Sequence, residues 1–336
     1  MKEIIIRDNE AGQRFDKYLK KYMPDASSGF LYKMLRKKNI VLNGKKADGK
    51  EILHVGDCVK LFLSDETISK FSSRKQKPAS YPVSSDLKVV YEDRDILLLN
   101  KPAGMLSQKA EKTDVSVTEY VIGYLLESGQ MKPEELQTFH PSICNRLDRN
   151  TSGLIAAGKS LAGLQKMSAL FKDRTLKKYY LCFVKGRITE PAYIRAYLKK
   201  DEQTNKVDVR KEEADGYSLI ETEYVPAACN ADMTLLKVHL MTGRTHQIRA
   251  HLASTGHPLL GDYKYGERSF NEEYRKRYGI TSQILHAYQL VFPEMEAPFS
   301  HLSGRAFTAD VPRVFYRITE ETKWEHGNPE DLEALH

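Results

Sequence analysis

Cysteine, tryptophan and long apolar runs are all scarce in this sequence. Its 336 residues include four cysteines and one tryptophan, and no two cysteines form a C-x-x-C pair. Four scattered cysteines do not make a disulfide framework or a zinc site. No apolar run approaches the roughly 20 residues that span a bilayer, and the first residues lack the apolar core of a signal peptide. We therefore expect a reduced, cytoplasmic protein without a membrane segment.

Positive charge is concentrated at one end of the chain. The net charge is +7, and residues 1–63 hold 14 lysines and arginines against 8 aspartates and glutamates. A basic segment joined to a nearly neutral body suggests a unit that binds a polyanion such as RNA. The alternative is a solvated basic surface that binds nothing.

The basic segment has the pattern of a small α/β unit. Apolar residues at helical spacing predict helices over 13–23 and 30–38. A strand over 40–42 runs into an Asn-Gly turn, a strong hairpin signal, and a further strand is expected over 58–63. These features together resemble the small RNA-binding domain first seen in a ribosomal small-subunit protein. We expect residues 1–68 to form such a domain, with RNA contacts from Arg14, Lys33, Arg36, Lys37 and Lys38.

The composition changes after this unit. Residues 69–85 are rich in Ser and Lys, with an Arg, a Gln and two Pro and no apolar period, which predicts a flexible linker. Beyond it, strands are expected over 89–91, 96–99, 176–184, 217–224, 233–240 and 285–292, and helices over 116–128, 160–172 and 245–254. This pattern predicts an α+β fold over 86–322, with a mixed, mainly antiparallel sheet and flanking helices. Residues 323–336 are expected to be an acidic tail.

The most informative stretch, residues 145–158, reads NRLDRNTSGLIAAG. Asp148 lies between Arg146 and Arg149, and a Thr-Ser-Gly turn follows. Nearby positive charge favours the ionised form of an acid. We therefore expect Asp148 to be a charged carboxylate beside an anion-attracting surface.

Two further segments carry residues suited to chemistry. In residues 171–180, Lys178 and Tyr180 would share one face of a strand, because the strand period is two. A tyrosine can stack on a base and assist a proton transfer, although an ordinary core tyrosine would fit the pattern equally well. Residues 242–262 contain three histidines, but His246 and His251 are five apart, unlike the four-residue spacing of a helical zinc pair. We therefore expect no metal site.

These segments, in order, resemble the motifs of the RsuA/RluA family of RNA pseudouridine synthases. Residues 145–154 match the family form H-R-L-D-x-x-T-S-G-L, except that Asn145 stands where the family usually has His. Residues 243–252 match G-R-T-H-Q-I-R-x-H-L. The likeness spans residues 1–320 and is greatest to the RluC/RluD branch. Its ordered motifs lie at 97–104, 145–154, 171–180, 242–262 and 285–287.

The resemblance implies an enzyme that isomerises uridine to pseudouridine in RNA, with large-subunit ribosomal RNA favoured over transfer RNA. It implies catalytic roles for Asp148, Tyr180 and Arg249, with Arg249 paired to Asp148. Isomerisation adds and removes no atoms, so no cofactor is expected. RNA is the expected partner of a monomeric protein. The implied substrate contacts are Arg146, Arg174 and Lys178 with phosphates, and Leu285 with the target base.

Two other classes of function remain open from the sequence. A glycosidase also cleaves a glycosidic bond, but it normally needs two carboxylates, and no second acid near these motifs is an obvious partner for Asp148. A catalytically silent RNA-binding assembly factor also remains open because Asn145 departs from the family pattern. A catalytically silent protein is not expected, however, to have the complete set of Asp148, Tyr180 and Arg249.

Overall fold

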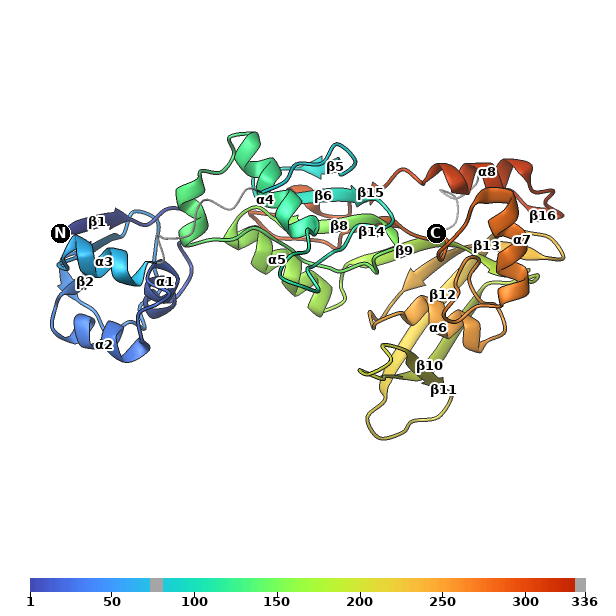
Figure 1. Ribbon diagram of the computed structural model, residues 1–336, viewed down its shortest axis with the longest axis horizontal. Coiled ribbons are helices and arrows are strands. Elements are labelled where there is room, and N and C mark those ends of the chain that lie inside the picture. Colours follow the sequence, from blue (N-terminus) through green and yellow to red (C-terminus); the bar gives the residue numbers. More distant parts are fainter. Residues whose placement is uncertain (73–80, 330–336) are drawn as a thin grey trace.

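The computed structural model describes residues 1–72 and 81–329, which form a small sheet at one end of an elongated molecule and a large sheet across the rest (Figure 1). Of the linker expected at 69–85, residues 73–80 are outside the described part. Among the described residues, no helix is long and apolar enough to cross a membrane.

The small sheet has four strands in the order β1-β4-β2-β3. The second predicted helix begins and ends two residues earlier than expected. Ser27 caps its start by accepting a hydrogen bond from Phe30 N at 3.2 Å, and Lys38, with φ 59°, lies beyond its end. The elements are β1 (Lys2–Ile5), α1 (Phe15–Tyr22), α2 (Ser28–Arg36), β2 (Ile40–Leu42), β3 (Lys45–Lys46), β4 (Cys58–Leu61) and α3 (Asp65–Phe71).

Helix α3 crosses the boundary expected at residue 68. Ser64 caps it by accepting from Thr67 N at 3.2 Å, and Ile68 is buried in the N-terminal core. The Phe71 ring lies 4.7 Å from that of Phe30 in α2. Residues 69–71 therefore belong to a packed helix rather than to a linker. The sequence pattern missed α3 because it offers few apolar residues at helical spacing.

The large sheet has twelve strands, with the main order β11-β10-β12-β13-β9-β14-β8-β6-β5. Its pairs are antiparallel except β14 with β8, so the prediction of a mixed, mainly antiparallel sheet is confirmed. The strands are β5 (Lys88–Glu92), β6 (Ile96–Lys101), β7 (Ser142–Ile143), β8 (Ser152–Gly158), β9 (Lys177–Lys185), β10 (Ala192–Lys200), β11 (Val207–Arg210), β12 (Ser218–Cys229), β13 (Met233–Leu240), β14 (Leu285–Val291), β15 (Ala306–Thr308) and β16 (His326–Gly327).

Helices cover both faces of the central strands. In β6, Leu97 and Leu99 face one apolar cluster, while Ile96 and Leu98 face another. A strand buried on both faces has a continuous apolar run instead of an alternating one. The helices are α4 (Val117–Glu127), α5 (Leu161–Lys172), α6 (Gln247–Ser254), α7 (Arg268–Tyr278) and α8 (Arg313–Glu321), with short 3-10 turns at Pro133–Gln137 and Ser300–Leu302.

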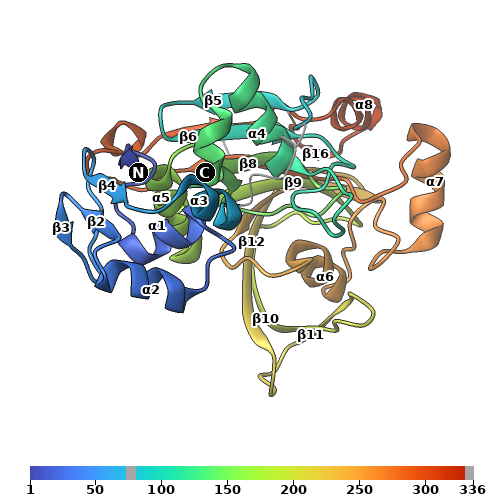
Figure 2. The same cartoon turned by 60° about the vertical axis from the view of Figure 1, so that its left-hand side comes forward.

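Several elements were not predicted. Helix α7 has mostly polar residues and is held by its buried aromatic rings Phe270, Tyr274 and Tyr278. Strands β10 and β11 form a hairpin that projects from the body, with α6 beside it (Figure 2). Because much of that hairpin is exposed, its apolar alternation is weak.

The expected acidic tail at 323–336 is structured over its first part. Strand β16 pairs with β12, and the Trp324 ring stacks on Phe183 with centroids 6.3 Å apart. The backbone N–H of Glu325 donates to Cys229 O at 3.0 Å. Residues 323–329 therefore pack on the large sheet, and residues 330–336 lie outside the described part of the chain.

Candidate active site

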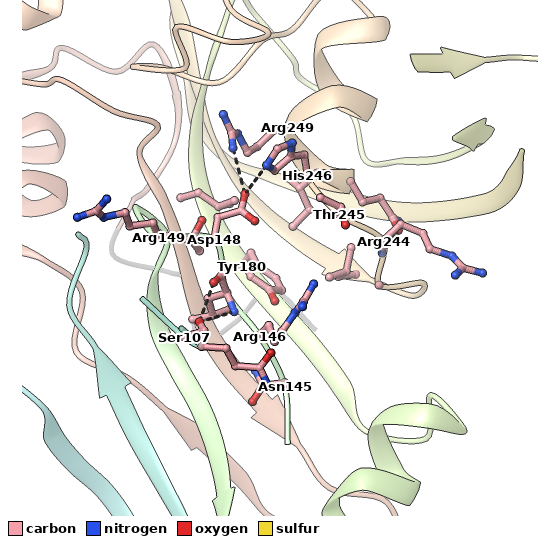
Figure 3. A pocket seen from close by; sticks show the side chains of 18 of the residues that line it. Ser107, Asn145, Arg146, Asp148, Arg149, Tyr180, Arg244, Thr245, His246 and Arg249 are labelled. Atoms are coloured by element: carbon pink, nitrogen blue, oxygen red, sulfur yellow. Dashed lines mark hydrogen bonds and ion pairs between the residues drawn. The ribbon is translucent and has the colours of Figure 1, made fainter. Parts of the chain in front are cut away.

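A pocket of about 730 Å³ opens where the loop before β8, the strands β9 and β14, and the start of α6 meet (Figure 3). Because these segments are far apart in sequence, only the fold brings their side chains together. Of the seven residues predicted for catalysis and substrate contact, six line the pocket, and Arg174 does not. The six are Arg146, Asp148, Lys178, Tyr180, Arg249 and Leu285.

Asp148 begins the turn that leads into β8, and its carbonyl accepts from Thr151 N at 3.0 Å. Its Oδ2 lies 3.1 Å from Arg249 Nη1, while no described residue donates to its Oδ1. The charge that faces this carboxylate therefore comes from α6. The sequence neighbours expected to supply that charge make no ion pair with Asp148 among the described residues: Arg149 donates to Gly104 O at 3.1 Å, and Arg146 is exposed. Successive side chains of an extended loop point in different directions.

Arg249 is held by a second carboxylate. Its Nε and Nη2 donate to the two oxygens of Asp262 at 2.7 and 2.9 Å, and Asp262 is 1% exposed. Burial alone would lower the pKa of Arg249, but the hydrogen bonds and charges of Asp262 and Asp148 outweigh it and raise that pKa. A bidentate pair fixes the plane of a guanidinium. Asp262 therefore aims the remaining nitrogen of Arg249 at Asp148.

The segment after β6 clamps the loop on both sides of Asp148. Ser107 Oγ donates to Leu147 O at 2.7 Å and accepts from Leu147 N at 3.0 Å. On the other side, the buried Lys101 donates to Arg149 O at 3.0 Å, as does Gly104 N at 2.9 Å. The residues before and after Asp148 are thus tied to one short segment. The sequence resemblance singled out 97–104, but it gave no signal for Ser107.

Asn145 anchors the start of the same loop. Its Oδ1 accepts from Ala156 N at 2.7 Å, and its Nδ2 lies 3.3 Å from Leu154 O. Both partners lie in β8. An amide carries a donor and an acceptor, so Asn145 bonds this strand in both directions and keeps the loop in place without the family's usual His.

Tyr180 and Lys178 point into the pocket from β9, as their alternation predicted. Each is 8% exposed, and neither polar head has a partner among the described residues. Burial raises the pKa of Tyr180, and the charge of Asp148 acts in the same direction. Burial lowers the pKa of Lys178 to about 8, and the charge of Arg174 adds to this shift. The pocket thus contains an unpaired phenol and an unpaired amine, with the apolar Leu285 beside them.

His246 also lines the pocket, and the resemblance assigned it no role. It precedes α6 with φ 53°, and its Nδ1 lies 2.8 Å from Tyr265 Oη. Because Tyr265 Oη accepts from Val207 N at 3.0 Å, its own proton is available to His246 Nδ1. The ring proton then lies on Nε2, 3.9 Å from Asp148 Oδ2. Burial lowers the pKa of His246, although Asp148 opposes this shift.

The other histidines of this segment have separate partners. His251 Nδ1 lies 3.0 Å from Thr222 Oγ1, and His257 Nδ1 lies 2.9 Å from Lys185 O. Within residues 1–72 and 81–329, no three His, Cys, Asp or Glu side chains gather in a way that could hold a metal ion. The lining of the pocket contains one carboxylate, Asp148, because Asp262 is buried behind Arg249. A two-carboxylate glycosidase site is therefore not formed here.

The predicted RNA contacts of the N-terminal unit lie outside this pocket. Four of them are exposed on and just after α2. The fifth, Arg14, precedes α1 and forms a salt bridge of 2.7 Å with Asp16. This pairing means that Arg14 is the least available of the set. The ones that are exposed and have no ion pair within the described residues are Lys33, Arg36, Lys37 and Lys38.

Comparison with known proteins gives a consistent result. The family described as RNA pseudouridylate synthase matches residues 95–254. An uncharacterised RNA pseudouridine synthase of Mycoplasma genitalium is 30% identical over 88% of this chain and 90% of its own length. A ribosomal large subunit pseudouridine synthase C of Vibrio vulnificus is also 30% identical, with the same coverages.

Structural similarity points to the same fold. The human RNA pseudouridylate synthase domain containing 4 aligns with a TM-score of 0.57 and 19% identity, over 71% of this chain and 94% of its own. The ordered motifs, the pocket they build and the 30% identity over most of the chain agree. This chain belongs to the RNA pseudouridine synthase family.

Proposed function

We propose that this enzyme converts uridines of large-subunit ribosomal RNA to pseudouridine. The proposal of substrate class is supported by its 30% identity to the large-subunit synthases of two Vibrio species. The proposal of mechanism is carried by one observation: Arg249, held by Asp262, binds one oxygen of Asp148 and leaves the other open to the pocket.

The target uridine has to leave its stack to reach Asp148, as it does in other enzymes that act on a base. The flipped ring would lie between Tyr180 and Leu285, which line the pocket from β9 and β14. Both side chains offer apolar surface to the ring. Arg146 and Lys178 would meet the phosphates of the flipped nucleotide, and Arg174 would add charge from outside the pocket.

The reaction breaks the bond from ribose C1′ to uracil N1 and forms the bond from C1′ to C5. The proton on C5 is lost and N1 gains one, so no atom is added or removed. Asp148 acts through Oδ1, as nucleophile or base at the sugar or the ring. Arg249 donates to Oδ2 and stabilises the ionised form of the Asp148 carboxylate. Because the pKa of Tyr180 is raised, its phenol stays protonated and can donate a hydrogen bond to the flipped nucleotide.

The N-terminal unit would supply affinity rather than chemistry. Four cations on and after α2 are exposed and lack ion pairs among the described residues, which suits contacts with phosphates. We propose the N-terminal unit, extended from residue 68 to the end of α3 at Phe71, as the RNA-binding domain of a monomeric enzyme that acts in the cytoplasm, where ribosomal RNA is reached.

Mapping pseudouridines in total RNA from a strain that lacks the gene tests the substrate. We expect one or a few uridines of large-subunit ribosomal RNA to lose the modification. The wild-type gene should restore it, and an Asp148→Asn variant should not, because the amide keeps the shape and loses the charge. Purified Asp148→Asn protein should bind the RNA within a few-fold of wild type.

Three results would contradict the proposal. Loss of pseudouridine from transfer RNA alone would assign the other substrate class. Restoration by Asp148→Asn would overturn the role of the carboxylate. If the deletion removes pseudouridine from no RNA, although the parent strain expresses the protein, a silent RNA-binding factor would be favoured.

A further inference from the structure

A second hollow, of about 370 Å³, adjoins the catalytic pocket. Arg249 lines both cavities. A third hollow lies between them: Asp148 lines it and the catalytic pocket, and Gln283 lines it and the second hollow. The three therefore form one continuous path past the Asp148–Arg249 pair. We call the second one the Gln283 hollow; its distinctive lining residues are Asn150, Lys206, Tyr263, Lys264 and Gln283.

Gln283 is buried and unpaired. It is 6% exposed, and its amide has no hydrogen-bond partner among the described residues, yet it faces the hollow. The backbone beside it is fixed: Ile284 N donates to Leu260 O at 2.9 Å, and Gly261 packs so closely that a Cβ there would lie 2.3 Å from Ser282 O. Buried amides are normally paired. An unpaired amide on a fixed backbone is therefore suited to a ligand that offers both a hydrogen-bond donor and a hydrogen-bond acceptor.

An exposed aromatic ring stands at the same hollow. Tyr263 is 43% exposed and has no aromatic or hydrogen-bond partner among the described residues. Its position is set by Asp262, whose Oδ1 accepts from Lys264 N at 2.9 Å and from Tyr265 N at 3.1 Å. The same carboxylate holds Arg249, so the backbone that carries the ring lies in a fixed place beside the catalytic pair.

The charge around the hollow is positive. Lys206, Lys264 and Arg249 line it, and no carboxylate does. Lys264 Nζ bonds to Asn205 O, which keeps it beside the opening. Burial lowers the pKa of Lys264, and the charges of Arg249 and Lys206 act in the same direction, as expected of crowded cations. Such a cluster attracts an anion.

We propose that the Gln283 hollow is a subsite for the nucleotide next to the target uridine in the same RNA strand. The Gln283 and Asn150 amides read its base edge, Tyr263 stacks on its base, and Lys206 and Lys264 meet its phosphate. Unstacked bases held on aromatic rings and read at their edges are the usual basis of sequence recognition in RNA. The inference rests on the proposed function, because it requires the enzyme to act on an RNA strand.

Short RNAs with a single mapped target uridine test this subsite. Each of the four nucleotides is placed before and then after the target, and kcat and KM are measured. Wild type should prefer particular nucleotides at one neighbouring position. Gln283→Ala should reduce that preference about 10-fold. Tyr263→Ala should raise KM about 10-fold for every neighbour, because stacking tolerates all bases. Saturating RNA should restore kcat in both variants.

Matched controls are available in the same domain. Gln289→Ala removes a half-buried amide of β14, and Tyr316→Ala removes an exposed tyrosine of α8; neither residue lines the three hollows. Both should behave as wild type. Thermal unfolding of each variant checks that it folds.

If folded Gln283→Ala and Tyr263→Ala keep the wild-type KM and neighbour preference, the hollow is not a nucleotide subsite. A fall in kcat alone would also overturn the proposal, because that pattern belongs to a residue that positions Asp148. Wild-type protein that modifies no RNA would instead overturn the proposed function.

Discussion

Lysine and arginine behave differently in the two parts of this molecule. Two of those around the catalytic pocket are buried: Lys101 is wholly covered and bonded to three backbone carbonyls, and Arg249 lies between two carboxylates. On and after α2 in the N-terminal unit, the cations from Lys33 to Lys38 are exposed and lack ion pairs among the described residues. The same residue types thus fix the loop and the carboxylate of Asp148 in one region and present positive charge to solvent in the other.

The difference predicts different energetics. A buried, paired charge leaves an uncompensated partner when it is removed, which is costly. Exposed charges act through the long-range field and are screened by salt. Changes in the pocket should therefore alter turnover at any salt concentration, whereas changes on α2 should alter affinity in a salt-dependent way.

Arg249→Met should show the largest effect of the changes that test this contrast. It leaves Asp148 and the buried Asp262 without their shared cation, which costs about 3–5 kcal/mol, so kcat should fall at least about 100-fold. Steady-state kinetics on the mapped RNA measure it. Arg275→Met, an exposed change on α7, is the control and should keep wild-type turnover. Near-normal kcat in Arg249→Met would show that the pair does not support catalysis.

Ser107→Ala should come next. It removes the side chain that both donates to and accepts from Leu147, which leaves two buried backbone groups unpaired at 1–3 kcal/mol, or about 10-fold in kcat. KM should change little, because Ser107 positions Asp148 rather than the RNA. Ser128→Ala, at the end of α4, is the matched control. A lower melting temperature with unchanged kcat would make Ser107 a purely structural residue.

The amine of Lys178 should make RNA binding depend on pH. Its pKa is lowered to about 8, so the side chain is charged at pH 7 and mostly neutral at pH 9. With Asp148→Asn protein, which prevents turnover, affinity for the target RNA should fall about 10-fold as pH rises through 8. Lys178→Arg should remove this dependence, because arginine stays charged. An equal loss in Lys178→Arg would assign the effect to another group.

Replacing the four exposed cations of the N-terminal unit should have the smallest effect of these changes on RNA affinity near physiological salt. Replacing them together should weaken RNA binding about five-fold and reduce the salt slope by about three, since each phosphate contact adds a nearly unit slope. kcat should not change. Filter binding at several salt concentrations measures the slope. An unchanged slope would mean that this face is only solvated. The four substitutions are Lys33→Gln, Arg36→Gln, Lys37→Gln and Lys38→Gln.

Much of the fold was readable from local pattern. A helix was expected over 160–172, and α5 begins there, where the Ser160 side chain accepts from Gly163 N at 3.0 Å. The Asn-Gly turn after Ile40–Leu42 forms the predicted hairpin, with Asn43 at φ 51°. Elements held by distant partners were missed. Helix α7 depends on three aromatic rings buried against the large sheet, and β16 depends on the edge of β12.

The sequence by itself determined the family, because the family follows from short ordered motifs, and it predicted six residues that line one pocket. The tertiary structure alone decided which groups meet. It gave Asp148 a partner from α6 instead of its own neighbours, placed Ser107 against Leu147, and left the Gln283 amide with no hydrogen-bond partner in the part of the chain that the structure describes. The physical reason is that hydrogen bonds and ion pairs depend on distances of a few ångströms between segments far apart in the chain, and no local pattern of residues encodes those distances.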